Sequence, residues 1–322
     1  MTPPRIVGLR SPGRRLVVML AVLLVSTAGC QRKGKLTFAL PTSDWWTAAP
    51  FLLKESESFY RDQGIELDIV EVNSGLASKN SVLAGTADVG LSAATPLALA
   101  AAREEKLVIL GTYLRSSGVV GLVRRADAPP GPIPPEPVAV VKSTISESFL
   151  YSYLARKGNQ GLVESKELHE LATRPADVPA VLSSGSARSA VVWEPFLSLA
   201  GRRDGFVVER GDDFEVNLYL LARPSVVREH PDDIARFLAA VTRACDYLRD
   251  HSPQAQKQME DHFRFPDHFL AEVWPLVHYE ILDDRARMTK EILREAQTAR
   301  RLGYVERDVT SVDYLFRSGD SR

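Results

Sequence analysis

The sequence has only two cysteines, six histidines and no excess of positive charge. With 40 Lys and Arg residues against 41 Asp and Glu residues, it lacks the basic character that nucleic-acid binding requires. Its N-terminal apolar run, residues 16–27, is too short for a membrane-spanning helix. Phosphate-loop, dinucleotide-binding and nucleophile-elbow motifs are absent, and His262 and His268 lack the spacing of metal ligands. We therefore expect no nucleic-acid partner, no cofactor and no metal.

The first 35 residues have the pattern of an export signal followed by an anchor. Four arginines precede the apolar run, and Ala28-Gly29-Cys30 follows it. Small residues before a cysteine at this place are typical of bacterial lipoprotein cleavage sites. We expect residues 1–29 to be a signal peptide, Cys30 to carry lipid, and residues 30–35 to form a lipid-anchored spacer. The alternative is an ordinary signal peptide that contains a cysteine.

Cys245 is the other cysteine, so a chain with lipid on Cys30 has no disulfide to form. The residues around it, 233–251, have helical spacing, and we expect the thiol to be buried as a small apolar group. The fold must then rest on its hydrophobic core.

Strands alternate with helices along most of the chain, which predicts an α/β fold. Apolar or alternating runs predict strands at 36–40, 65–72, 87–92, 107–114, 138–142, 162–171, 189–193, 205–211 and 216–223. Helical spacing predicts helices at 48–64, 75–85, 96–105, 146–158 and 175–185, and further helices from His230 to near the end.

Two similar stretches indicate two similar lobes. Residues 81–96 and 180–195 share a helix end, a glycine turn, a short strand and a following proline. Between them, six prolines within residues 126–137 predict a stiff, extended crossing. We expect one lobe from residues 36–125 and 216–322, and a second from residues 138–215. "GLVRR" (121–125) and "YLLAR" (219–223) would be paired hinge strands.

Five motifs in this order resemble the periplasmic solute-binding proteins of ABC importers: the lipobox, "GTADVG", "KSTISE", "VVWEPF" and "HPDDIARFLAAVTRACDYLRDHSP". The chain is most similar to the nitrate, sulfonate and taurine type, which includes binders of thiamine pyrimidine precursors. The resemblance implies the two-lobed type II binding-protein fold. Each lobe would be a mostly parallel sheet flanked by helices, and a two-strand hinge would join the lobes.

The same resemblance implies a function without catalysis. The protein would be a monomer that binds a small solute between its lobes and delivers it to the permease and ATPase subunits of an importer. Its lipid would hold it on the bacterial membrane, facing the periplasm or the cell exterior.

Open α/β sheets bind ligands at the carboxyl ends of their strands. The residues at these positions are the candidate ligand-binding residues: Trp45, Trp46, Ser74, Gly75, Ser92, Arg115, Lys142, Ser143, Thr144, Trp193 and Glu194.

The segment Lys142-Ser143-Thr144 allows two interpretations, because it joins a strand to a helix. If Ser143 caps the helix, the free N–H groups of its first turn face an anion. If Thr144 and Glu147 form a capping box, those donors are already occupied. The sequence leaves both open.

The ligand is likewise open between two classes. The lysine and the hydroxyl groups of this segment favour a small anion such as a sulfonate, nitrate or taurine. Trp45, Trp46, Trp193 and Glu194 favour a planar heterocycle such as a thiamine pyrimidine precursor. A pyrimidine-precursor synthase and a sensory lipoprotein are alternatives from other functional classes.

Overall fold

The computed structural model describes residues 34–128, 137–159, 161–162 and 168–316. The expected signal peptide, Cys30 and most of the proline-rich crossing lie outside these residues. Among the described residues, no helix is long and apolar enough to cross a membrane.

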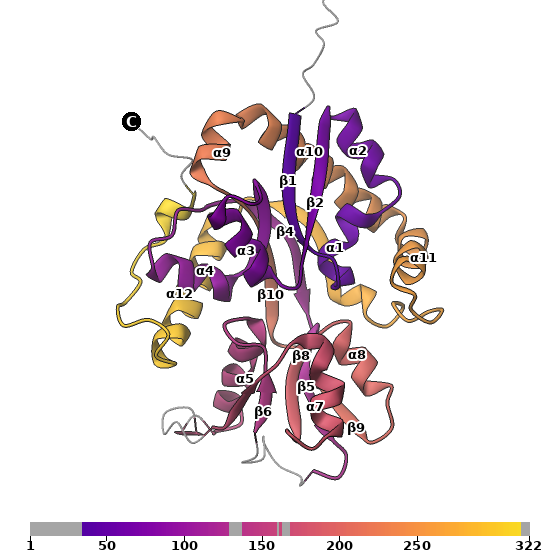
Figure 1. Ribbon diagram of the computed structural model, residues 1–322, viewed down its shortest axis with the longest axis vertical. Helices are drawn as coiled ribbons and strands as arrows, with labels where there is room; N and C mark the ends of the chain where they lie inside the picture. Colours follow the sequence, from indigo (N-terminus) through magenta and orange to yellow (C-terminus); the bar gives the residue numbers. More distant parts are fainter. Residues whose placement is uncertain (1–33, 129–136, 160, 163–167, 317–322) are drawn as a thin grey trace, which may run out of the picture. The chain divides into compact units, whose positions relative to one another are not determined.

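The first sheet has six strands in the order β11-β4-β10-β3-β1-β2. Figure 1 labels β1, β2, β4 and β10. Parallel pairing joins β1 (Gly34–Pro41) to β2 (Ile65–Val72) and to β3 (Val89–Ala93). Antiparallel pairing joins β10 (Glu215–Ala222) to β3 and β4 (Val108–Ser117), and β11 (Val277–Leu282) to β4. The sheet is mixed rather than mostly parallel, because β10 inserts between β3 and β4 and runs opposite to both.

The second sheet has five strands in the order β7-β6-β8-β5-β9. Its centre is parallel: β6 (Val138–Val140) pairs with β7 (Glu170–Ala172) and with β8 (Ser189–Trp193). β5 (Val120–Arg125) runs antiparallel to β8 and to β9 (Phe206–Arg210). We call the parts built on the two sheets lobe I and lobe II.

Two segments cross between the lobes side by side. The chain leaves lobe I from β4 into β5 and returns from β9 into β10. Gly118 and Gly211 lie at the two crossing points, where the Gly118 N–H donates to the Gly211 carbonyl at 3.2 Å. Gly118 has φ +73°, a conformation that side chains disfavour, and a Cβ on Gly211 would meet the Phe149 ring at 2.2 Å. Glycine is therefore required at both crossings.

The hinge strands do not pair as the sequence predicted. Residues 121–125 pair with β8 and β9, whereas β10, which holds most of 219–223, pairs with β3 and β4. The predicted pairing of these two segments is wrong, because they belong to different sheets. The two crossing segments that do run together are β4–β5 and β9–β10.

Helices flank both sheets (Figure 1). Those of lobe I are α1 (Trp45–Leu52), α2 (Ser56–Asp62), α3 (Gly75–Ala84), α4 (Ala94–Ala102), α9 (Pro224–Glu229), α10 (Pro231–Asp250), α11 (Ser252–Phe263) and α12 (Arg285–Arg301). Those of lobe II are α5 (Ile145–Arg156), α7 (Val178–Ser183) and α8 (Phe196–Gly201). Short 3₁₀ turns lie at Pro175–Asp177, Trp274–Leu276 and Asp313–Phe316.

Three predicted elements differ from the structure. Of the strand expected at 162–171, the described residues show only β7, Glu170–Ala172, and residues 161–162 are helical. The single helix expected at 48–64 is split into α1 and α2, because Leu53 takes an extended conformation with ψ 143°. The helical region expected from His230 onward contains a strand, β11, which adds to the edge of the first sheet. Pro275 ends the helical spacing just before this strand, and tertiary pairing with β4 decides its conformation.

Candidate functional site

A small cavity lies where the two lobes meet. Lobe I contributes residues from the start of α1 and of α3 and from the end of β3, and lobe II contributes the start of α5 and the end of β8. Its volume is about 40 Å³, which is room for a water molecule or two. The lobes are therefore closed together in this structure, and a solute of several heavy atoms requires them to separate.

Two tryptophans hold the lobes together by reciprocal hydrogen bonds. The Trp46 indole of lobe I donates to the Glu194 carbonyl of lobe II at 2.9 Å. The Trp193 indole of lobe II donates to Asp44 Oδ2 of lobe I at 3.0 Å. Both indoles line the cavity. They therefore act as cavity walls and as contacts of the closed state.

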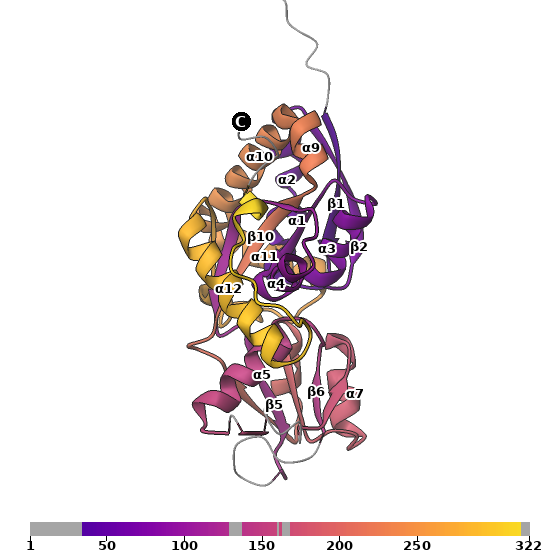
Figure 2. The same ribbon diagram turned by 90° about the vertical axis from the view of Figure 1, so that its left-hand side faces the viewer.

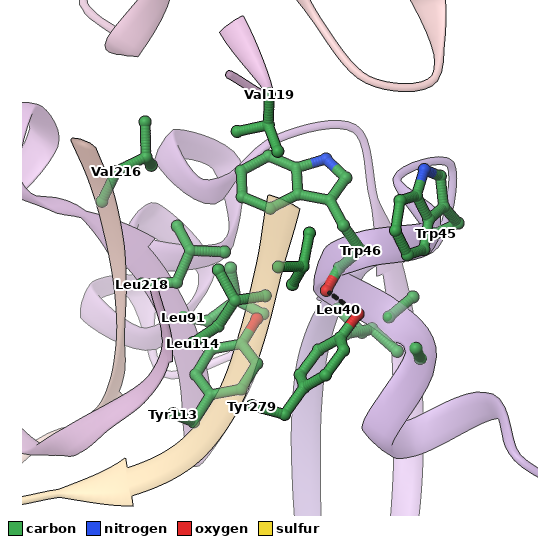
Figure 3. Packing of buried hydrophobic residues seen from close by; sticks show 14 of the residues in the cluster. Leu40, Trp45, Trp46, Leu91, Tyr113, Leu114, Val119, Val216, Leu218 and Tyr279 are labelled. Carbon is green, nitrogen blue, oxygen red and sulfur yellow. Dashed lines mark hydrogen bonds between the residues drawn. The ribbon is translucent and has the colours of Figure 1, made fainter. Parts of the chain in front are cut away.

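Two buried tyrosines anchor the backbone that carries Trp46 (Figure 3). The Tyr279 hydroxyl donates to the Trp46 carbonyl at 2.9 Å, and the Tyr113 hydroxyl donates to the Thr47 carbonyl at 3.0 Å. Both tyrosines come from neighbouring strands, β11 and β4. These two hydrogen bonds hold the first turn of α1 in place. The Trp46 ring extends toward Val119, next to the crossing between the lobes (Figure 3).

Asp44 is the one ionisable side chain among the described residues that line the cavity. Its exposed fraction is 3%. Burial raises the pKa of its carboxyl to about 7, although hydrogen bonds from Trp193 and Ser43 act in the opposite direction. No lysine or arginine among these lining residues compensates its charge. Asp44 therefore changes protonation near neutral pH.

The start of α3 forms another part of the lobe I wall. Ser74 caps the helix, since its hydroxyl accepts from the Ala77 N–H at 3.2 Å. Gly75 and Leu76 follow it and also line the cavity. A Cβ on Gly75 would lie 3.3 Å from the Ser92 Cα, so glycine lets the helix start pack closely on β3. The N–H groups of this first turn are suited to bind an anion.

The start of α5 settles the choice between the two caps in favour of Thr144. Its hydroxyl accepts from the Ser146 N–H at 3.2 Å and donates to the Val141 carbonyl at 2.6 Å. Ser143 has φ +59° and is not the cap. The Glu147 carboxylate accepts from the Ser143 N–H at 2.9 Å. A carboxylate thus already occupies this helix start.

Lys142 lies beside the cavity lining and not within it. Its ammonium group pairs with Glu147 at 3.0 Å and with Glu170. Tyr151 also donates to Glu170, and Tyr304 donates to Glu147 at 2.5 Å. The geometry does not support the expected contact of Lys142 with a ligand, because its charge is neutralised within lobe II.

Five other candidates also lie outside the lining: Ser143, Arg115, Glu194, Trp45 and Ser92. Arg115 pairs with Glu280 at 3.5 Å. Glu194 turns its carboxylate to Arg210, at 2.6 Å, and only its carbonyl faces lobe I. Trp45 is fully buried and stacks on Trp274 with a ring distance of 5.3 Å. Ser92 is buried in β3 behind Gly75.

The cavity brings together five of the predicted residues: Trp46, Ser74, Gly75, Thr144 and Trp193. Ligand contact by them stays a prediction. Asp44 and Thr47 were missed, although both flank the tryptophan pair that was noticed. The available signal was an acidic residue three positions after the end of the first strand, at the start of a helix.

The chain is similar to known proteins in sequence and in structure. Residues 45–129 match the family model described as "NMT1/THI5 like". A stretch of 91 residues is 26% identical to an aliphatic sulfonates-binding protein of Bacillus subtilis, and it covers 27% of this chain and 27% of that relative. The sequence match therefore spans about a quarter of the curated relative.

Solved structures match over most of the chain. The periplasmic aliphatic sulphonate binding protein SsuA from Escherichia coli has a TM-score of 0.69 at 18% identity, over 85% of this chain and 94% of that one. The periplasmic nitrate-binding protein NrtA from Synechocystis PCC 6803 has a TM-score of 0.66 at 15% identity, over 88% and 84%. The chain therefore has the periplasmic binding-protein fold, and its residues 45–129 match the family model described as "NMT1/THI5 like".

Proposed function

We propose that the protein is the solute-binding subunit of an ABC importer. It is exported, held at the membrane by lipid on Cys30, and delivers a small solute to a permease and ATPase without catalysing a reaction. The observation that carries this proposal is the closed cavity to which both lobes contribute walls. Solute would stabilise a closed state that is wider than this one, because a cavity of about 40 Å³ cannot hold it, and it would do so through contacts with both walls. The binding-protein relatives named above support the same function.

A small anion such as a sulfonate or nitrate is the first candidate ligand. The names of the relatives and the α3 helix start at the cavity both support it. Hydroxyl groups of Ser74, Thr47 and Thr144 add neutral polar groups to the lining. A charged Asp44 would repel an anion, but a protonated carboxyl can donate a hydrogen bond to one. Anion binding would then be coupled to proton uptake by Asp44.

A planar heterocycle with an amino group is the second candidate, and Asp44 is the observation that favours it. An ionised carboxylate in a buried site is a strong acceptor for an amino or ring N–H group. The indoles of Trp46 and Trp193 offer faces or edges to a flat ring. The two ligand classes therefore require opposite protonation states of one side chain.

A thermal-shift screen separates the two classes. We expect ethanesulfonate or nitrate to raise the melting temperature by several degrees at pH 6, and by less at pH 8. An aminopyrimidine that stabilises the protein at pH 8, while neither anion does so at either pH, would replace the first candidate by the second. If no member of either class stabilises the protein, both ligand assignments are wrong.

The anchor is tested separately by growing cells with labelled palmitate. The wild-type protein should take up label and sediment with membranes, and Cys30→Ser should do neither. An unlabelled wild-type protein in the soluble exported fraction would restrict the proposal to a soluble binding protein. Recovery from the cytosol would favour the enzyme alternative.

A further inference from the structure

A second set of hydrogen bonds joins the lobes, apart from the tryptophan pair. Ser148 of α5, in lobe II, donates to Glu295 Oε2 of α12 at 2.5 Å. The Tyr304 hydroxyl, which follows the end of α12, donates to Glu147 Oε1 of α5 at 2.5 Å. We call these four residues the α12 clasp. They do not line the cavity between the lobes, so the clasp is separate from the cavity walls.

The lobe I side of the clasp is fixed to its own lobe. Met288 and Ile292 of α12 are buried in one core cluster with Leu97 of α4. Figure 2 shows α12 extending along α4 toward α5. Thr95 of α4 also donates to Glu295 Oε2, at 3.0 Å. Helix α12 therefore moves with lobe I, and its hydrogen bonds to α5 have to break when lobe II moves away.

The lobe II side of the clasp is connected to the cavity through α5. Thr144 and Ile145, at the start of this helix, line the cavity, and Ser148 lies one turn further along it. A movement of α5 that widens the cavity therefore also displaces Ser148 from Glu295. The exposed fractions of these two residues are 3% and 5%, so water does not compete for their hydrogen bond while the lobes are together. Hydrogen bonds to a charged acceptor are among the stronger ones in proteins.

We propose that the α12 clasp is an autoinhibitory contact, which holds the lobes in an arrangement that excludes the solute. This arrangement leaves about 40 Å³ between the walls, which is too little for a solute of several heavy atoms. Bonds that stabilise it compete with binding, because the apparent affinity falls with the fraction of the protein that is able to bind. The inference rests on the proposed function, but the effect of the clasp on the lobes is measurable without a solute.

Hydrogen exchange of the indole N–H groups of Trp46 and Trp193 measures the separation of the lobes. Both N–H groups are hydrogen-bonded across the lobes, and such protons exchange when the contact opens. Ser148→Ala leaves the buried Glu295 carboxylate with one donor fewer while the lobes are together. We therefore expect both indole protons to exchange about tenfold faster in this variant, as measured by NMR. Unchanged exchange in Ser148→Ala would overturn the proposal.

Two further variants accompany Ser148→Ala. Tyr304→Phe removes the other hydrogen bond of the clasp and keeps the ring. It should accelerate the exchange by only about threefold, because Glu147 keeps its bonds to Lys142 and to the Ser143 N–H. Thr298→Ala is the matched control on α12, since its hydroxyl donates to a carbonyl of the same helix. It should exchange like the wild type.

Titration with ethanesulfonate connects the clasp to binding. Ser148→Ala should bind this anion about threefold to tenfold more tightly than the wild type, and Thr298→Ala should bind it equally well. Equal or weaker binding by Ser148→Ala would overturn the proposal, because the clasp would then not oppose the solute. If no variant binds ethanesulfonate while Ser148→Ala accelerates the indole exchange, the clasp holds the lobes as proposed and the anion assignment fails.

Discussion

The two walls of the cavity differ in how their polar groups are paired. In lobe I, Asp44 is buried and pairs with no lysine or arginine in the described part of the chain, and the α3 helix start lines the cavity. In lobe II, Glu147 occupies the α5 helix start, and Lys142 neutralises Glu147 and Glu170. The lobe I wall therefore has polar groups available for a ligand, whereas the charged groups of lobe II are bound to one another. We infer that lobe I recognises the solute and that lobe II closes over it with Trp193.

Of the substitutions that test this difference between the two walls, Gly75→Leu should have the largest effect on ligand affinity. A Cβ at this position would lie 3.3 Å from the Ser92 Cα, so a leucine must displace the α3 start, which lines the cavity, from β3. We expect the affinity for the cleft ligand to fall by about 100-fold or more, which corresponds to roughly 3 kcal/mol. Calorimetric titration measures the affinity, and circular dichroism checks that the variant is folded. An unchanged affinity in a folded variant would remove α3 from the site.

Asp44→Asn should change the pH dependence of stability. Burial raises the pKa of Asp44 from its ordinary value to about 7, so the folded state holds this proton more tightly than the unfolded chain does. The wild type therefore loses stability as the pH rises from about 4 to about 7. At pH 8 we expect the variant to be more stable than the wild type by about 1–3 kcal/mol, and this gain should vanish near pH 4.

Chemical denaturation of both proteins at several pH values measures this difference. The unfolding free energy of Asp44→Asn should fall less steeply with rising pH than that of the wild type. It should still fall, because burial raises the pKa of Glu291 in the same way. If the unfolding free energies of the two proteins change with pH in parallel, the pKa of Asp44 is not raised.

Glu147→Gln tests the lobe II wall through stability and not through affinity. The carboxylate is buried and bonds to Lys142, to the Ser143 N–H and to Tyr304. Its replacement leaves Lys142 with one partner, and we expect a loss of about 1–2 kcal/mol in unfolding free energy. The affinity for the cleft ligand should change by less than about threefold. A large gain in anion affinity would show instead that the Glu147 carboxylate prevents an anion from binding at the α5 helix start.

Lys142→Gln should have the smallest effect on binding. Since the ammonium group is bound within lobe II and does not line the cavity, we expect less than a twofold change in the affinity for any anion. Glu170→Gln is the matched control, because it removes the opposite partner of the same pair. A tenfold loss of anion affinity in Lys142→Gln alone would restore the role that the sequence suggested for this lysine.

The difference between the walls also shows how far the sequence could lead. Trp46, Ser74, Gly75 and Thr144 were predictable as cavity residues, because each follows a strand and local rules of capping and turns apply there. Lys142 looked equally suitable, but its charge is paired with Glu170, 28 residues away. Its neighbour Glu147 accepts a hydrogen bond from Tyr304, 157 residues away. Spacing along the chain carries no information about such distant partners.

The fold was predictable to a similar depth. The alternation of strands and helices identified two α/β lobes and most of their strands. It missed β11, whose conformation depends on pairing with β4, and it paired the hinge strands wrongly because their partners lie in separate sheets. Asp44 shows the same limit for chemistry, since its raised pKa comes from burial that only the closed structure reveals.

The pH dependence of ligand affinity tests the central claim most directly. We would measure the Kd of ethanesulfonate by titration between pH 5.5 and pH 8.5, for the wild type and for Asp44→Asn. If lobe I binds an anion together with a proton on Asp44, the wild-type Kd rises about tenfold per pH unit above 7, and that of Asp44→Asn stays level. Tight anion binding with no pH dependence in the wild type would contradict the assignment of recognition to this wall.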